Sequence, residues 1–274
     1  MVQGSLTPTA TLTQGQGMPD ILVAKQDSVA VVSLNRPAVR NAVTLMMWRE
    51  LAGIFSSLAS DGDVRAIVLM GSGADFCVGA DVSEFGRVRE NRDQSAAYEV
   101  SVDACTAAIT DIAKPVIAAI SGYCLGGGCH LALACDFRFA DPTAQLGIPS
   151  ARLSIVYGVK SVQRLLATAG LANAKRMLYS GERYDAARAR SMGLVDEISD
   201  DAKAAATAFA KNLAGNAPLS VAGAKYMLSG LSMGDGALDV AAAQRLIDAA
   251  ADSEDFREGR RAFAEKRVPR FRGR

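Results

Sequence analysis

Apolar and polar residues follow two different periods along the first part of the chain. Short apolar runs typical of strands are ILVAKQDSVAVVSLNRP (21–37), RAIVLMGSG (65–73), KPVIAAISG (114–122) and DFRFA (136–140). The first stretch holds two such runs around a polar Lys-Gln-Asp-Ser segment, which predicts a β-hairpin. Residues 43–60 instead carry apolar side chains at helical spacing. Strands that alternate with helices predict an α/β architecture with much parallel pairing.

After about residue 200 the strand pattern ends and helical segments follow. Gly, Pro and Asp breaks separate DAKAAATAFAKNLAG, PLSVAGAKYMLSG, ALDVAAAQRLIDAAADS and EDFREGRRAFAEKR. We therefore divide the chain into an α/β core, residues 18–200, and a helical region, residues 201–274. The apolar faces of these helices predict packing on the core or on another subunit. The polar stretch 86–103 is predicted to be a mobile helix or lid.

The first segment, residues 1–17, has neither charge nor an apolar run, and it is predicted to be a disordered tail or a cloning remnant. No apolar stretch in the sequence is long enough to cross a bilayer. We expect a soluble protein without a membrane partner.

The charge and the cysteines exclude several classes of protein. With 30 basic and 29 acidic residues there is no basic field for nucleic acid. An odd count of 5 cysteines indicates reduced thiols and a cytoplasmic location. Cys124, Cys129 and Cys135 lack the paired spacing of a zinc site, so no metal ion is expected.

Two glycine-rich turns are candidates for chemistry. GSGADF (71–76) has Phe76 where a dinucleotide-binding turn needs its third glycine. GYCLGGG (122–128) has Gly128 where a P-loop needs lysine. Neither turn therefore predicts a nucleotide site.

The same glycines fit a different purpose. Gly126, Gly127 and Gly128 let the chain turn tightly where a helix begins, with no Cβ to shield an amide. The partial positive charge of that helix end would stabilise an oxyanion. The turn in DFCVGAD (75–81) offers another amide, at Ala80. Two such amides on one oxygen would form an oxyanion hole, and two ordinary tight turns are the alternative.

The sequence resembles a known family in several stretches that occur in the family's order. They are NRPAVRNAVT (35–44), DFCVGADVSEF (75–85), KPVIAAISGYCLGGGCHLALACDFRFA (114–140) and SEDFREGRRAFAEKR (253–267). They are similar to the enoyl-CoA hydratase/isomerase, or crotonase, superfamily. The resemblance implies a spiral core of repeated ββα units and C-terminal helices that build a trimer, or a hexamer of two trimers. It also implies an acyl-CoA thioester substrate, with coenzyme A as part of the substrate and no other cofactor.

The resemblance also assigns positions in the site. It implies that the amides of Ala80 and Gly127 hold the thioester oxygen. The positions that match contacts to substrate or CoA are Arg40, Ala42, Val78, Ala80, Asp81, Val82, Phe263 and Lys266.

The acid–base positions depart from the family pattern. A family hydratase uses two glutamates, and His130 and Ser150 stand at the matching positions. A family isomerase typically uses a carboxylate at the second position, which Ser150 does not supply. The positive helix end should keep His130 neutral and able to accept a proton, with Ser150 holding a water or orienting the ring. The alternative for His130 is a packed core histidine in a site that has lost its chemistry.

Tyr157 is the third candidate catalytic residue. Its position resembles that of an active-site tyrosine in decarboxylating members of the superfamily, and a packed core tyrosine is the alternative. Glu84, Glu90 and Glu99 are acidic residues that also come into question near a substrate. Asp136 is expected to be structural.

Three functions are therefore compatible with the sequence. The first is an enzyme that stabilises a thioester enolate, nominally an enoyl-CoA hydratase/isomerase. The second is a decarboxylase or hydrolase that uses His130 and Tyr157. A nucleophilic Ser150 is disfavoured, because IPSAR is not a GxSxG elbow. The third is a non-catalytic acyl-CoA-binding protein. We favour an enzyme, because a titratable histidine at the first acid–base position is unexpected in an inert site.

Overall fold

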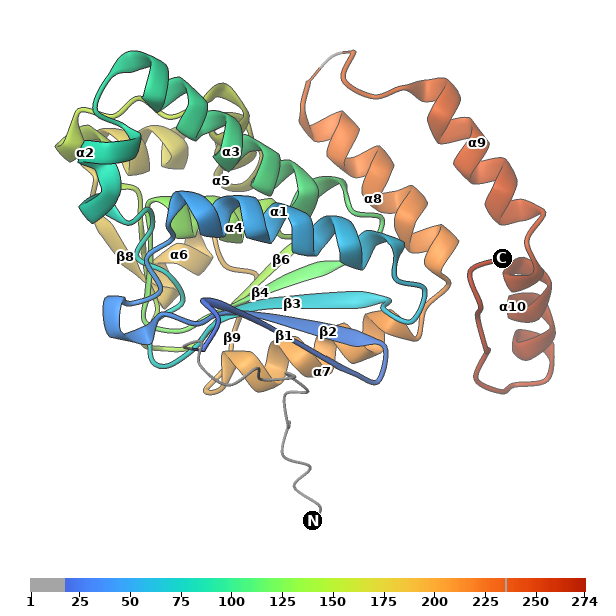
Figure 1. Ribbon diagram of the computed structural model, residues 1–274. Coiled ribbons are helices and arrows are strands. Elements are labelled where there is room, and N and C mark those ends of the chain that lie inside the picture. The colour runs from blue at the N-terminus through green and yellow to red at the C-terminus, as the bar shows by residue number, and fades with distance from the viewer. Residues whose placement is uncertain (1–17, 235) are drawn as a thin grey trace.

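The larger of two sheets has six strands in the described part of the chain, in the order β1-β2-β3-β4-β6-β9 (Figure 1). The structure is a computed structural model and describes residues 18–234 and 236–274, so the predicted N-terminal tail lies outside it. The strands of this sheet are β1 Ile21–Gln26, β2 Val29–Leu34, β3 Ala66–Gly71, β4 Val116–Ile120, β6 Phe137–Ala140 and β9 Glu197–Ile198.

The predicted hairpin is confirmed. β1 and β2 pair antiparallel, while every other neighbouring pair in the larger sheet is parallel. Only Asp27 and Ser28 form the turn, with left-handed φ values of 51° and 63°. Such a two-residue turn matches the twist of the strands it joins.

A second sheet of three strands runs beside the first and consists of β5 Tyr123–Leu125, β7 Gln145–Gly147 and β8 Arg183–Asp185. The chain passes from β4 to β5 and then into α4 Gly127–Ala134, and from β6 directly to β7. Single bridges, Val43 with Ala80 and Cys77 with Cys124, extend the second sheet toward the start of the chain. Sequence reasoning missed β5, β7, β8 and β9, because two or three residues are too few to show an alternating pattern.

Helices cover both faces of the larger sheet (Figure 1). The remaining elements of the core are η1 Pro37–Val39, α1 Leu45–Ser60, η2 Val82–Glu84, α2 Phe85–Val88, α3 Arg92–Asp111, η3 Pro149–Leu153, α5 Val159–Ser180, which is interrupted at Gly170, and α6 Ala186–Ser191. The main hydrophobic core lies between the larger sheet and the helices α1, α3 and α4. On the other face, α7 Ala202–Ala214 places alanines against β2, β3, β4 and β6. Small side chains allow that close approach.

The last three helices, α8 Pro218–Ser232, α9 Val240–Ala251 and α10 Glu254–Ala264, extend away from the sheet toward the right of Figure 1. Together with α7 they confirm the four helices expected after residue 200. Large apolar side chains of this region, such as Leu228 and Leu231, stay exposed. Among the described helices, none is long and apolar enough to cross a membrane.

Candidate active site

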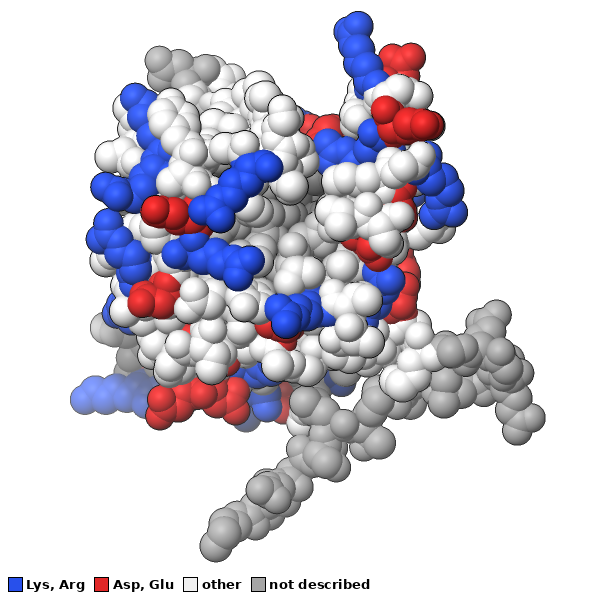
Figure 2. Space-filling view, turned by 90° about the vertical axis from the view of Figure 1, so that its left-hand side faces the viewer, with Lys and Arg blue, Asp and Glu red and all other residues white. Residues whose placement is uncertain are grey.

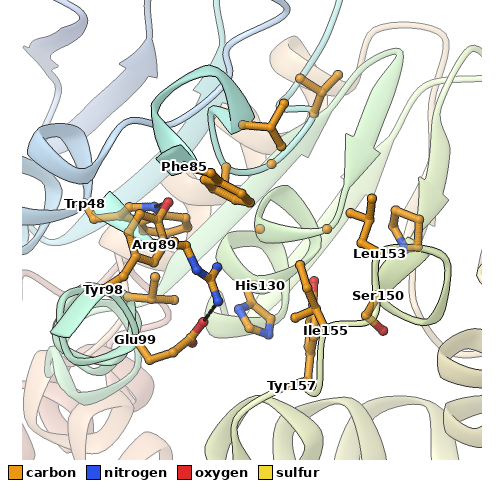
Figure 3. A pocket seen from close by; sticks show the side chains of 18 residues that line it. Trp48, Phe85, Arg89, Tyr98, Glu99, His130, Ser150, Leu153, Ile155 and Tyr157 are labelled. Atoms are coloured by element: carbon orange, nitrogen blue, oxygen red, sulfur yellow. Dashed lines mark hydrogen bonds and ion pairs between the residues drawn. The ribbon is translucent and has the colours of Figure 1, made fainter. Parts of the chain in front are cut away.

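A cavity lies between the start of α4, the segment after β7, helix α1 and the segment from η2 to α3 (Figure 3). The site residues expected from the sequence that line it are Val78, Ala80, Val82, Gly127, His130, Ser150 and Tyr157. These residues come from different turns and helices, so the fold brings together what the sequence separates.

The peptide N–H of Ala80 faces the start of α4. Val43 N–H donates to the carbonyl of Gly79 at 2.8 Å, and Asp81 N–H donates to the carbonyl of Val43 at 2.9 Å. In this parallel bridge the hydrogen bonds to Val43 use the carbonyl of Gly79 and the N–H of Asp81. The N–H of Ala80 itself therefore points away from Val43.

The N–H of Gly127 lies beside it. Gly127 is the first residue of α4, and an N–H at that position has no acceptor within the helix. A Cβ built on Gly127 would lie 3.2 Å from the nitrogen of Ala80, and one built on Gly79 would lie 3.0 Å from the nitrogen of Gly127. Among the described residues, none accepts a hydrogen bond from either N–H. Two unpaired donors therefore lie side by side at the cavity wall.

Glycine is needed for this approach. Gly126, the N-cap of α4, has φ 51° and ψ −114°, which side chains rarely adopt. Gly79 has φ 101°, and a Cβ there would lie 2.8 Å from the carbonyl oxygen of Leu125. The expected tight turn at a helix start is therefore present, with the helix beginning at Gly127 rather than after Gly128.

His130 is buried in the first turns of α4. Burial, and after it the charge of Arg164, lowers the pKa of His130 to about 3. The ring is therefore neutral near pH 7, as expected, but the causes are burial and Arg164 rather than the helix end. An imidazole with so low a pKa is a weak base and holds a proton poorly. General-base catalysis by His130 near neutral pH is therefore disfavoured.

The partner of the His130 ring is Ser161 rather than Ser150. Ser161 Oγ lies 3.4 Å from His130 Nδ1, and Nε2 is buried without a partner among the described residues. Ser150, in η3, lines the cavity but has no hydrogen bond to the ring among those of the described residues. Nothing in the sequence pointed to Ser161, which follows His130 by 31 residues.

Tyr157 packs against the histidine and reaches the glycine turn. The rings of His130 and Tyr157 meet edge to face with their centres 4.4 Å apart. A Cβ on Gly126 would lie 3.7 Å from the Tyr157 hydroxyl. Burial raises the pKa of Tyr157, so this hydroxyl stays protonated and can donate a hydrogen bond next to the two amides.

The opposite wall was largely missed by sequence reasoning. Trp48 on α1 donates its Nε1–H to the hydroxyl of Tyr98 on α3 at 2.8 Å, and both side chains line the cavity. Arg89 and Glu99 complete this wall (Figure 3). The polar stretch 86–103 was the available signal: it named Glu99 together with Glu90 as acidic candidates but did not show which of them turns inward. It did not point to Arg89, Trp48 or Tyr98.

The other acidic candidates have different surroundings. Glu84 accepts a hydrogen bond from the N–H of Leu45 at 2.6 Å, at the start of α1. Glu90 is exposed. Asp136 accepts hydrogen bonds from Val116 N–H and Lys225 Nζ, both at 2.8 Å, and so ties α8 to the sheet.

Several expected CoA contacts lie outside the cavity. Arg36 donates to the carbonyl of Ala42 and to the carboxylate of Asp81, each at 2.8 Å, which fixes the segments that carry these residues. The Arg40 side chain is 58% exposed. Figure 2 shows this side of the molecule, with Lys and Arg side chains spread over it and acidic ones between them.

Phe263 and Lys266 are not brought to the cavity within one chain. Phe263 is 87% exposed near the end of α10, and Lys266 follows that helix. In Figure 1, α10 lies at the right-hand end of the molecule, opposite α2 and well separated from the centrally placed α4.

Comparison with known proteins shows what this arrangement belongs to. Residues 24–274 match the profile of the family described as enoyl-CoA hydratase/isomerase. The chain belongs to the enoyl-CoA hydratase/isomerase family. It is 34% identical over 261 residues to the 2,3-dehydroadipyl-CoA hydratase of Escherichia coli, with 94% of this chain and 100% of that protein covered.

Solved structures of the enoyl-CoA hydratase/isomerase family agree with the fold. An enoyl-CoA hydratase/carnithine racemase from Magnetospirillum magneticum is 33% identical with a TM-score of 0.88, covering 94% of this chain and 97% of that one. An enoyl-CoA hydratase from Bacillus anthracis is 32% identical with a TM-score of 0.84, covering 93% and 100%. The expected crotonase-like α/β fold is confirmed.

Proposed function

We propose that this protein acts on acyl-CoA thioesters and that the N–H groups of Ala80 and Gly127 bind the thioester oxygen. The observation that carries the proposal is the pair of adjacent N–H groups without partners at the cavity wall. The family supports the substrate class, because its named relatives act as enoyl-CoA hydratases.

The chemistry follows from the two donors. When a proton leaves the α-carbon, or a nucleophile adds to the β-carbon of an enoyl thioester, negative charge develops on the thioester oxygen. Fixed N–H groups stabilise that charge without reorganisation, and one such donor is typically worth about 10²–10³ in rate. The positive end of α4 adds to this effect.

The surroundings of the donors suit an oxyanion. His130 is neutral, and the Tyr157 hydroxyl is protonated, so neither places a negative charge beside the oxygen. Trp48, Phe85 and Tyr98 form apolar surfaces of the cavity. A cavity with such walls strengthens electrostatic interactions, because it holds less water than a surface site.

We also propose a homo-oligomer, a trimer or a dimer of trimers, built through α8–α10. Exposed apolar side chains on these helices, among them Leu228, Leu231 and Ile247, support this. Packing of α10 on a second copy would bring Phe263 and Lys266 near a CoA bound there. Light scattering with size-exclusion chromatography tests the proposal, and a monomer at micromolar concentration would contradict it.

The test of the oxyanion hole is Gly127→Ala. The added methyl would lie 3.1 Å from Trp48 Cζ2 and 3.2 Å from Ala80 N, so it occupies the space of the thioester oxygen. We expect exchange of the α-protons of hexanoyl-CoA with deuterated solvent to fall by about 10²-fold or more. The matched control is Gly53→Ala on α1, where a Cβ meets nothing within 4 Å.

Each outcome decides between functions. Wild-type exchange that Gly127→Ala abolishes and Gly53→Ala preserves supports the proposal. Exchange that Gly127→Ala leaves intact would place the oxyanion elsewhere. Hexanoyl-CoA that binds to the wild type without exchange would instead indicate a non-catalytic acyl-CoA-binding protein.

A further inference from the structure

A carboxylate lies in the wall of the cavity. Among the described residues that line it, Glu99 of α3 is the single Asp or Glu, and Arg89 is the single Lys or Arg. Sequence reasoning placed the chemistry at His130, Ser150 and Tyr157 and named Glu99 only among further acidic candidates. Glu84 is not part of the lining, and Glu90 in the same segment is exposed.

Glu99 is held by its neighbour at one oxygen only. Arg89, in the loop between α2 and α3, donates from its NH2 group to Glu99 Oε1 at 2.8 Å. The guanidinium also lies over the rings of Phe85 and Tyr98, 5.1 and 4.7 Å from their centres, and its side chain is only 15% exposed. Glu99 Oε2 has no hydrogen bond to any of the described residues. Arg89 therefore fixes the carboxylate and leaves its second oxygen available.

Glu99 and the glycine turn face the same space. In Figure 3, Arg89 and Glu99 are drawn on the left of the cavity, His130 and Tyr157 follow to their right, and Ser150 and Leu153 lie beyond them. The charge of Glu99 is one of the causes that raise the pKa of Tyr157, whose hydroxyl lies beside Gly126. Glu99, Tyr157 and the two amides line the same cavity, so a substrate bound at the amides would share that space with the Glu99 carboxylate.

The surroundings also make Glu99 a better base than a free carboxylate. Burial raises the pKa of Glu99, and Arg89 opposes that rise only in part. His130 holds a proton poorly, and the Tyr157 hydroxyl releases one reluctantly. Of the titratable side chains that line the cavity in the described part of the chain, Glu99 is thus the one best suited to take up a proton and return it.

We propose that Glu99 is the catalytic acid–base residue of this cavity and that it moves a proton between the α- and γ-carbons of a 3-enoyl-CoA to give the 2-enoyl-CoA. The inference rests on the proposed function, because the intermediate needs the Ala80 and Gly127 amides. It assigns to this chain the isomerisation of a β,γ-unsaturated thioester, with the base on α3 rather than on α4 or η3.

The reaction balances with a single carboxylate. Glu99 takes a proton from the α-carbon, and the C–H electron pair forms a dienolate whose negative charge lies on the thioester oxygen. The protonated Glu99 then gives the proton to the γ-carbon, the double bond moves to the α,β-position and the thioester carbonyl re-forms. Glu99 returns to its ionised form, and no water or other reactant is consumed. Hydration instead calls for one group that activates water and another that protonates the α-carbon.

The experiment compares Glu99→Gln with Glu90→Gln. Glu99→Gln keeps the shape of the side chain and removes its basicity, while Glu90 lies in the same segment with an exposed side chain. The substrate is 3-hexenoyl-CoA, and formation of the conjugated thioester is followed by absorbance. Binding of saturated hexanoyl-CoA is measured by calorimetry with every variant, and the melting temperature reports folding.

We expect the wild type and Glu90→Gln to isomerise 3-hexenoyl-CoA at equal rates. Glu99→Gln should lose about 10²–10⁴-fold in kcat and still bind hexanoyl-CoA with a Kd within about threefold of the wild type, as expected when only proton transfer is removed. Arg89→Gln removes a positive charge that lowers the pKa of Glu99, so the acid limb of its pH–rate profile should move to higher pH.

Other results would overturn the inference. If Glu99→Gln keeps the wild-type kcat, Glu99 and Arg89 form only a structural ion pair between α3 and its preceding loop. A wild type that hydrates crotonyl-CoA but does not isomerise 3-hexenoyl-CoA excludes the assigned reaction. In both cases loss of activity in Gly127→Ala would leave the proposed function standing. Failure of the wild type to bind hexanoyl-CoA would overturn the proposed function itself.

Discussion

The two walls of the cavity differ in what they offer a ligand. The wall built from Gly79, Ala80 and the start of α4 offers backbone N–H groups, whereas the wall built from α2 and α3 offers the charged pair Arg89 and Glu99. Backbone donors are fixed by the fold itself and cannot take up a proton. Side chains can exchange protons, but their position depends on a segment that the sequence predicts to be mobile. In the mechanism that we propose, charge stabilisation and proton transfer would therefore take place on different walls.

The difference between the two walls can be tested by adding one methyl group to each of them. Gly79→Ala would place a Cβ 2.8 Å from the carbonyl of Leu125 at a φ of 101°, so backbone must move and the Gly127 amide with it. We expect a loss of about 3 kcal/mol in the free energy of unfolding, from strain and overpacking, together with loss of α-proton exchange.

The control comes from the opposite wall. Gly86 lies in α2 with nothing within 4 Å of a built Cβ, so Gly86→Ala should leave stability unchanged or slightly raised, as expected for alanine in a helix. Urea unfolding monitored by circular dichroism measures both variants. Equal destabilisation by Gly79→Ala and Gly86→Ala would show that the two walls accept an added methyl group equally well.

A smaller effect concerns pH, because the buried His130 makes the free energy of unfolding fall in acid. The pKa of His130 is lowered from 6.5 to about 3 in the folded protein, so below pH 6.5 the unfolded chain binds a proton that the folded chain does not. Stability from this group is thus fully present above pH 6.5 and is lost as the pH falls toward 3. Between pH 7 and pH 5 the loss should be about 2 kcal/mol.

His130→Gln removes this titration and so tests whether His130 causes the pH dependence of stability. The fall in unfolding free energy from pH 7 to pH 5 should be smaller in the variant than in the wild type by about 2 kcal/mol, whatever the variant's own stability at pH 7. Urea unfolding at the two pH values gives both slopes. Parallel slopes would mean that His130 is accessible and titrates normally in the folded protein.

Much of the fold could be read from the sequence, for reasons that are local. The hairpin around Asp27 and Ser28 and the four helices after residue 200 follow from apolar periodicity and helix breaks, which act over a few residues. The short strands β5, β7 and β8 could not be read in this way. Their residues are strands because neighbours in the spiral supply hydrogen-bond partners, and two or three residues carry no period of their own.

For the candidate site the division is different. The sequence alone determined the glycine turns at residues 79 and 126–128, because only glycine allows those backbone angles and that close approach. It also determined the order of the motifs, and with it the family. Tertiary structure decided which side chains meet: Ser161 rather than Ser150 at His130, and Glu99 rather than Glu84 or Glu90 in the cavity. Packing of α3 against α1 and α4 places Glu99, and packing of α5 against α4 places Ser161. Both contacts join segments that are far apart in the chain.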